Sequence, residues 1–132
     1  MTVKVAIIGT GWGTRIQVPA FRHVGAEVVG LWARSEEKAK QAASEHSIPF
    51  ATSDYKALLA RKEIDLVSVV TPPHVHAEIS IAALEAGKHV LCEKPTAFNA
   101  KEAQAMFDAA KKHQQLIALI DHELRFNPTR QK

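Results

Sequence analysis

Cysteine is nearly absent from this sequence. Cys92 is the single one among 132 residues, so no disulfide can form within the chain. A lone thiol fits a reducing compartment, and we expect a cytoplasmic protein. No apolar run reaches the ~18 residues that a membrane-spanning helix needs, so we expect no membrane partner. The first residues lead straight into a strand-like run, which leaves no room for a signal peptide.

The sequence also lacks a strong excess of charge of one sign. Its net charge is +3, and the basic residues are scattered along expected helix faces, which argues against a nucleic-acid partner. What is present is typical of a globular protein, with 46% hydrophobic and 23% charged residues. A chain of 132 residues is long enough for one domain with a proper core and too short for two.

Three glycines follow the first apolar run. Residues 3–8 have the short, β-branched character of a buried strand, and Gly9, Gly11 and Gly13 come directly after them. The first two glycines match the dinucleotide fingerprint G-x-G-x-x-G, but Thr14 stands in the third glycine position. The loop is therefore either a phosphate-binding turn at a helix N-terminus or simply a tight strand–helix turn.

Strands and helices are expected to alternate along the whole chain. Helices are expected over 15–24, 36–46, 74–86 and 99–114, with Pro19 in a first turn and with Ser35 and Asn99 as caps. Asp54 is expected to cap a brief helix over Leu58 and Leu59. No clear element is expected from 121 to 132. Such alternation predicts an α/β doubly wound parallel sheet, the Rossmann dinucleotide-binding fold. Strands are expected at 3–8, 27–33, 49–51, 65–70, 88–92 and 116–120.

Ligands of such a sheet bind beyond the carboxyl ends of its strands. After the second expected strand the chain reads Ala33-Arg34-Ser35, where NAD-binding domains carry an acidic residue for the ribose. Arg34 and the Ser35 hydroxyl could instead bind a 2′-phosphate, which favours NADP and leaves NAD possible. Glu36 is a mild counterargument, and Ser35 could be no more than a helix cap.

The fourth expected strand ends in Thr71-Pro72-Pro73-His74-Val75-His76. Pro72 and Pro73 would form a stiff wall suited to a flat ring, or would merely end the strand and start the helix. His74 and His76, two positions apart at a helix start, lie on different faces and have no carboxylate or thiol at ligand spacing. We therefore expect no metal.

Glu93-Lys94-Pro95 follows the fifth expected strand. A lysine at the ligand edge of the sheet can donate to a substrate hydroxyl or carbonyl, and a neighbouring carboxylate can pair with it. The alternative is an exposed Lys-Pro turn. Cys92 is expected to be a small core residue of the strand.

Taken together, these segments resemble the Gfo/Idh/MocA oxidoreductases in order and spacing. The resemblance rests on residues 9–13, 71–76, 86–95 and on Arg-Phe-Asn-Pro at 125–128. It implies an N-terminal Rossmann domain over 1–121 and, over 122–132, the start of a connection to a C-terminal domain that this chain lacks. It also implies that Lys94 is the catalytic lysine. It assigns cofactor contacts to Gly9, Thr10, Gly11, Trp12, Gly13, Arg34, Ser35, Thr71, Pro72, Pro73, His76, Glu93 and Lys94.

Two functions follow as hypotheses. The first is the cofactor domain of an oxidoreductase that transfers hydride between a nicotinamide dinucleotide and a sugar, polyol or related carbinol; the chain alone is then expected to be inactive. The second is a non-catalytic, stand-alone Rossmann module, a nucleotide sensor or an oligomerising scaffold. It draws on Leu124 and Phe126, whose exposure would favour a homo-oligomer.

Overall fold

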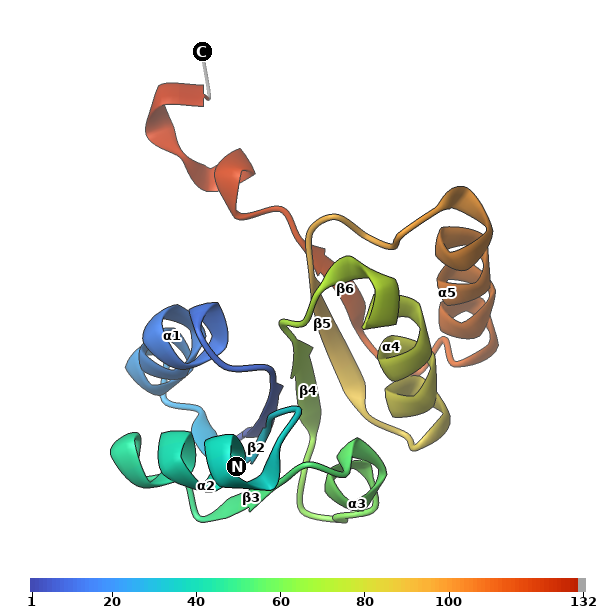
Figure 1. The fold of residues 1–132 in the computed structure, drawn as a ribbon. Coiled ribbons are helices and arrows are strands. Elements are labelled where there is room, and N and C mark those ends of the chain that lie inside the picture. The colour runs from blue at the N-terminus through green and yellow to red at the C-terminus, as the bar shows by residue number, and fades with distance from the viewer. Residues whose placement is uncertain (131–132) are drawn as a thin grey trace.

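The computed structural model describes residues 1–130, which form a doubly wound parallel sheet with helices on both faces (Figure 1). The six strands are all parallel and lie in the order β3-β2-β1-β4-β5-β6, so the chain reverses its direction of travel between β1 and β4. The predicted fold class is confirmed. The strands are β1 (Lys4–Ile8), β2 (Glu27–Trp32), β3 (Phe50–Thr52), β4 (Leu66–Val69), β5 (His89–Glu93) and β6 (Ala118–Asp121).

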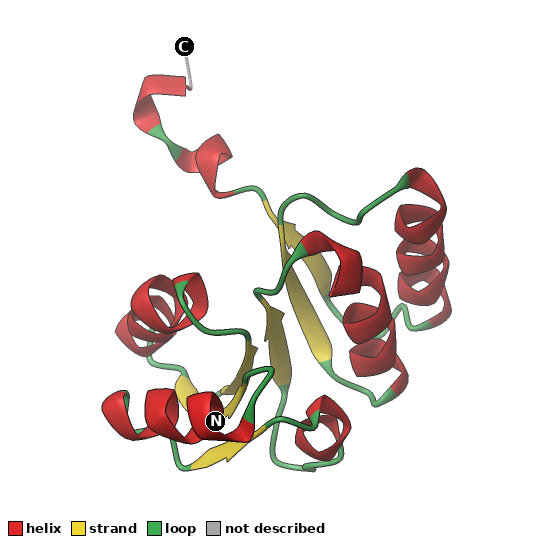
Figure 2. Cartoon of the chain, viewed as in Figure 1, coloured by secondary structure: helices red, strands yellow, loops and turns green. Residues whose placement is uncertain are grey.

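The helices cover both faces of the sheet, and β1 is therefore buried on both sides. Val5 and Ile7 of β1 pack in one cluster beside residues of the first two helices, whereas Ala6 and Ile8 pack in the cluster under the other three. Figure 2 shows the helices as separate layers around the central strands. They are α1 (Val18–His23), α2 (Glu36–Glu45), α3 (Tyr55–Leu59), α4 (His76–Glu85) and α5 (Ala100–Lys112). No helix in the described range is long and apolar enough to cross a membrane.

Local signals place the helix starts. The side chains of Ser35, Asp54 and Asn99 each accept a hydrogen bond from a backbone N–H two or three residues ahead, at 2.9 to 3.2 Å, so all three expected caps are present. Pro19 lies in the first turn of α1 as expected, although a π-helical turn already begins at Gly13 and runs to Gln17. A 3-10 turn at Pro73–Val75 likewise precedes α4.

The segment after β6 differs from the prediction. Instead of having no element, it forms two 3-10 turns, Glu123–Phe126 and Pro128–Arg130, and leaves the body of the domain (Figure 1). Asn127 between them is extended, with φ −71° and ψ 120°, because the residue before a proline avoids helical backbone. The last two positions of the predicted connection, 131 and 132, lie outside the described residues.

Candidate functional site

The glycine loop runs against the end of β4. Gly9 has φ +125°, and a Cβ there would lie 2.2 Å from the carbonyl oxygen of Val70, so no side chain fits. Gly11 has φ +72° and faces open space. Thr14, in the third glycine position, is buried and its hydroxyl donates to the Gly11 carbonyl at 3.3 Å. The Thr14 hydroxyl thus holds the loop from the buried side, and the side of Gly11 where a Cβ would stand remains open to a ligand.

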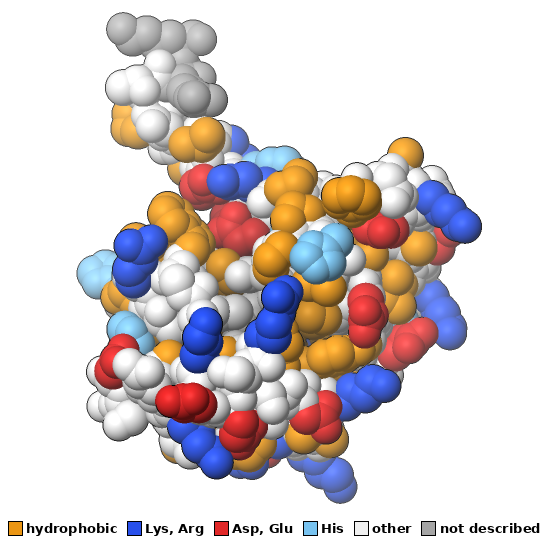
Figure 3. Space-filling model, in the orientation of Figure 1, with side chains coloured by type: hydrophobic (Ala, Val, Ile, Leu, Met, Phe, Trp, Pro, Cys, Tyr) orange, Lys and Arg blue, Asp and Glu red, His pale blue; other side chains and the backbone are white. Residues whose placement is uncertain are grey.

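A cleft of about 550 Å³ opens beside this loop, at the carboxyl ends of β1, β2 and β4. Lys and Arg side chains lie near the mouth of the hollow between α1 and α4 (Figure 3). The fold brings together segments as far apart in sequence as Gly9 and Ile79, as expected at the point where strand order reverses. Five predicted residues line the cleft: Gly9, Thr10, Arg34, Thr71 and Pro72.

The hydroxyl of Thr71 supplies a test of whether this cleft suits a polar ligand. Its Oγ1 atom is buried and has no hydrogen-bond partner among the described residues. A buried hydroxyl without a partner is costly, so its position beside the cleft favours a ligand that bonds to it. Together with the open face of Gly11, it fits a phosphate- and ribose-bearing ligand.

The β2 end of the cleft carries two cations. Arg34 and Lys38 both line it, and sequence analysis missed Lys38 because it lies inside α2 rather than in the loop. The Ser35 oxygen caps α2 by accepting from the Lys38 N–H at 3.2 Å, so its own O–H stays available to donate. Glu36 is engaged elsewhere: its carboxylate accepts from the Ser53 N–H at 2.8 Å and pairs with Lys40 at 3.3 Å. The Ser53 bond, and then Lys40, lower the pKa of Glu36.

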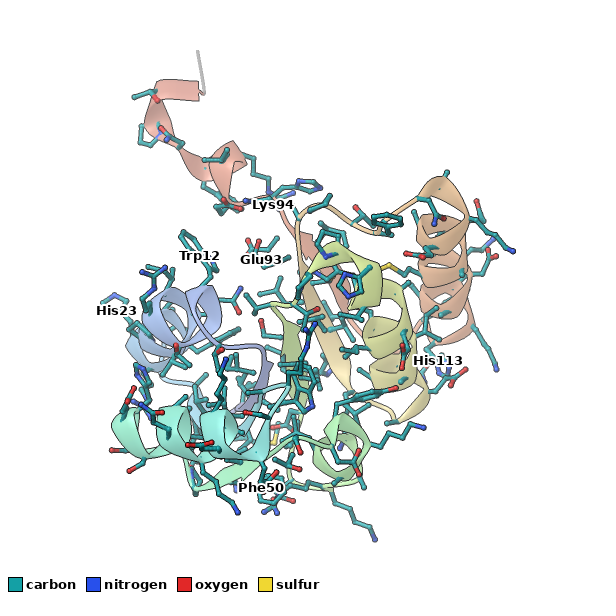
Figure 4. The ribbon with its side chains drawn as sticks, in the orientation of Figure 1. Trp12, His23, Phe50, Glu93, Lys94 and His113 are labelled. Atoms are coloured by element: carbon teal, nitrogen blue, oxygen red, sulfur yellow. The ribbon has the colours of Figure 1, made fainter. Side chains whose placement is uncertain are left out.

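A second group of predicted residues lies at the same edge, outside this cleft. Figure 4 shows Trp12, Glu93 and Lys94 toward the carboxyl ends of the strands, with Trp12 on the α1 side. Lys94 is half exposed, and its Nζ lies 3.8 Å from Glu123 Oε1. Pro73, in the turn before α4, does not line the cleft either.

Beneath Lys94 lies a buried polar network that the sequence did not reveal. Gln17 Nε2 donates to Glu93 Oε1 at 3.2 Å and to Asp121 Oδ2 at 3.5 Å, while the Ser68 hydroxyl donates to Gln17 Oε1. Glu93 is only 7% exposed, and its burial, followed by the nearby Asp121 carboxylate, raises its pKa. The one signal in the sequence was Ser68, a polar residue inside an apolar strand.

His76 takes a different position from the one that the resemblance implies. Its ring is 1% exposed, with Nδ1 2.9 Å from the Pro95 carbonyl oxygen and Nε2 2.7 Å from the Thr71 carbonyl oxygen. Both ring nitrogens therefore face the protein, and neither is left for a cofactor. His76 instead ties the loop after β4 to the loop after β5. His74 is exposed, and the described chain contains no group of residues suited to hold a metal ion.

Comparison with known proteins places these features in a family. The profile of GFO_IDH_MocA, an oxidoreductase family with an NAD-binding Rossmann fold, matches residues 3–120. Human glucose-fructose oxidoreductase domain-containing protein 2 is 40% identical over 128 residues, which are 97% of this chain and 33% of the relative. An uncharacterized oxidoreductase of Synechocystis is 32% identical over 127 residues, 96% of this chain and 34% of that protein. The chain thus spans about a third of the length of these relatives.

Solved structures agree with this placement. Levoglucosan dehydrogenase in complex with NADH superposes with a TM-score of 0.89 at 31% identity, covering 95% of this chain and 36% of the enzyme. A 3-ketoreductase from Actinomadura kijaniata, in complex with TDP-benzene and NADP, gives a TM-score of 0.86 at 30% identity, covering 98% of this chain and 41% of the enzyme.

Proposed function

The chain belongs to the Gfo/Idh/MocA oxidoreductase family and forms its NAD-binding Rossmann domain; from this premise we propose that it binds NADP(H) in preference to NAD(H) and serves the oxidation or reduction of a sugar, polyol or related carbinol. The observation that carries the proposal is the cleft in which the glycine loop, Arg34, Thr71 and Pro72 meet. We assign the cofactor domain to 1–121 and the connecting segment to 122–132.

Each part of the cleft has a matching group on the dinucleotide. The open face of Gly11 allows phosphate oxygens to approach the backbone of the loop. The unpartnered Thr71 hydroxyl is placed to bond to a ligand, and Pro72 presents a stiff apolar edge beside it. The nicotinamide, when bound, supplies the hydride chemistry.

The preference for NADP(H) rests on charge. Arg34 and Lys38 line the cleft where a ribose-binding acid would stand, whereas Glu36, the next acid in sequence, does not line it and is held by Ser53 and Lys40. A 2′-phosphate would therefore meet two cations and no opposing carboxylate at this corner. The two solved neighbours contain NADH and NADP respectively, so both cofactors occur within the fold.

Lys94 is the residue that we assign to the reacting oxygen of the substrate. Its half-exposed ammonium group can donate to a carbinol or carbonyl oxygen and help to move its proton. Solved neighbours include complexes with levoglucosan and with L-sorbose, which supports a sugar-like substrate.

The experiment is a titration of the chain with NADPH, followed by nicotinamide fluorescence, for the wild type and for Thr71→Val. The isosteric change removes a hydroxyl that has no hydrogen-bond partner in the described part of the chain, so we expect binding to weaken about tenfold, the size of one lost hydrogen bond, without loss of thermal stability. Ser80→Ala is the control, because its hydroxyl is also buried but lies beside Cys92 in a different cavity. Absence of NADPH and NADH binding by the wild type would overturn the proposed function.

A second candidate function is favoured by exposed apolar side chains at the β6 edge. Ile117, Leu119, Leu124 and Phe126 are all substantially exposed, which is typical of a surface that binds another protein surface. A non-catalytic, self-associating cofactor-binding module would show a dimeric mass by light scattering and no hydride transfer on a panel of sugars and polyols. Turnover on any of these substrates would exclude it.

A further inference from the structure

The far end of the cofactor cleft holds a hydrogen-bonded pair that the function described above does not use. Tyr55, at the start of α3, donates its hydroxyl to Glu78 Oε1 on α4 at 2.6 Å, and both residues line the cleft. The second oxygen of Glu78, Oε2, accepts no hydrogen bond within residues 1–130. The pair therefore presents one oriented and unoccupied carboxylate oxygen at the rim of the cleft.

The surroundings of this oxygen are those of a site for a flat base. Val75, in the 3-10 turn before α4, and Ile79 of α4 line the same end of the cleft and supply an apolar wall beside Glu78. Tyr55 is half-buried and packs on the core through its ring, which leaves its hydroxyl as the polar tip that meets the carboxylate. A pocket with apolar walls and one hydrogen-bond acceptor at a fixed position suits a heteroaromatic ring that carries an amino group.

The topology assigns this end to the adenosine half of the cofactor. Arg34 and Lys38, the proposed contacts to the ribose 2′-position, follow β2, and Tyr55 follows β3, the next strand outward. Thr71 and Pro72 follow β4 on the other side of the strand reversal. A dinucleotide with its ribose phosphate at Arg34 thus carries its base toward Tyr55 and Glu78.

We propose that Glu78, oriented by Tyr55, recognises the adenine base through its 6-amino group, so that the cleft selects adenine over hypoxanthine dinucleotides. This inference rests on the proposed function. The amino group of adenine donates to the free Glu78 oxygen, whereas hypoxanthine presents a carbonyl oxygen at the same position, and two acceptors repel each other. Glu78 is then a specificity-determining residue and Tyr55 a positioning residue.

The acidity of the phenol is consistent with this arrangement. The hydrogen bond to Glu78, followed by burial, raises the pKa of Tyr55 to about 12. The phenol therefore stays protonated over the physiological range and continues to hold Oε1.

The test compares NADH with reduced nicotinamide hypoxanthine dinucleotide, titrated against the chain by nicotinamide fluorescence. We expect the wild type to prefer NADH by about tenfold or more, the value of one hydrogen bond to a charged acceptor plus the repulsion avoided. Glu78→Gln keeps the size of the side chain and gives it an N–H, which should reduce the preference to about twofold or reverse it. Tyr55→Phe keeps the Glu78 carboxylate but removes the hydrogen bond that orients it, so its preference for NADH should lie between those of the wild type and Glu78→Gln.

Glu85→Gln is the matched control, because it makes the same change of charge on the last residue of the same helix, outside the cleft. Its preference for NADH should equal that of the wild type. Equal binding of both dinucleotides by the wild type, or an unchanged preference in Glu78→Gln, overturns the recognition of the base while dinucleotide binding stands. If the wild type binds neither dinucleotide, the proposed function fails and this inference fails with it.

Discussion

The corner formed by Arg34 and Lys38 gives the sharpest test of cofactor choice. Both side chains are exposed and line the cleft, Arg34 in the loop after β2 and Lys38 in the first turn of α2. A charge-assisted hydrogen bond contributes about 1.5–3 kcal/mol, and solvent screening at an exposed site favours the lower limit. Arg34→Ala should therefore weaken NADPH binding about tenfold.

Binding of NADH to Arg34→Ala should change by less than about twofold, because NADH has no 2′-phosphate for the guanidinium group to bind. Lys38→Ala should give a smaller loss for NADPH, about threefold, since a lysine binds phosphate as a point charge and not through two parallel hydrogen bonds. The preference of the wild type for NADPH should also decrease between about 50 mM and about 200 mM salt, as expected for an exposed ion pair.

The measurement is nicotinamide fluorescence with both cofactors, at fixed pH and at both salt concentrations. Lys112→Ala serves as the control, because Lys112 is an exposed cation on another helix, the last residue of α5, and does not line the cleft. If Arg34→Ala weakened NADPH and NADH equally, Arg34 would support the structure of the loop rather than bind the 2′-phosphate, and the reasoning for NADP(H) would be refuted.

Three further predictions concern single side chains. Absorbance titration should show Tyr55 ionising at about 12 in the wild type and near the ordinary tyrosine pKa of about 10 in Glu78→Gln. The pKa of Glu93 is raised in the folded protein, so its ionisation lowers the free energy of unfolding as the pH rises from the ordinary pKa through the raised one. Urea unfolding between about pH 4 and pH 8 should therefore show that Glu93→Gln loses less stability than the wild type over this range. His76→Phe should lower the free energy of unfolding by about 1–3 kcal/mol, because it removes the ring nitrogens that lie against the Pro95 and Thr71 carbonyl oxygens. The exposed His74→Phe should change it by less than about 0.5 kcal/mol, and equal losses would show that the ring contacts are not the cause.

Local chemistry explains why the order of elements could be predicted from the sequence. Apolar β-branched runs such as 65–70 became buried strands, and Ser35 capped its helix through its own side chain, a contact that spans three residues. The end of the chain was harder to predict. The turn at Glu123–Phe126 is a single short 3-10 element without an apolar period, and such elements leave no repeating signal in a sequence.

The location of the candidate site could be predicted from the sequence, but most of its side-chain contacts could not. Residues that follow strands meet at the cleft because parallel strands end at one edge, which the alternation of elements already implied. Tyr55 and Glu78 were missed because they belong to helices and meet across 23 residues of sequence. The burial of His76 had a signal that was not used: it shares a helical period with the buried Ile79 and Ala83, three and seven residues ahead.

Gln17 connects the glycine loop to the loop that carries Lys94. It ends the helical turn that begins at Gly13, directly after the glycine loop, and its amide bonds to residues of β4, β5 and β6. Glu93 is held at both oxygens, by Gln17 at Oε1 and by the Lys94 backbone N–H at Oε2. The Lys94 ammonium group, by contrast, makes no hydrogen bond within residues 1–130; it has a 3.8 Å ion pair with Glu123 and a charge interaction with Glu93. Of these two neighbours, Glu93 is therefore the fixed support, and Lys94 is the group that can turn toward a substrate oxygen.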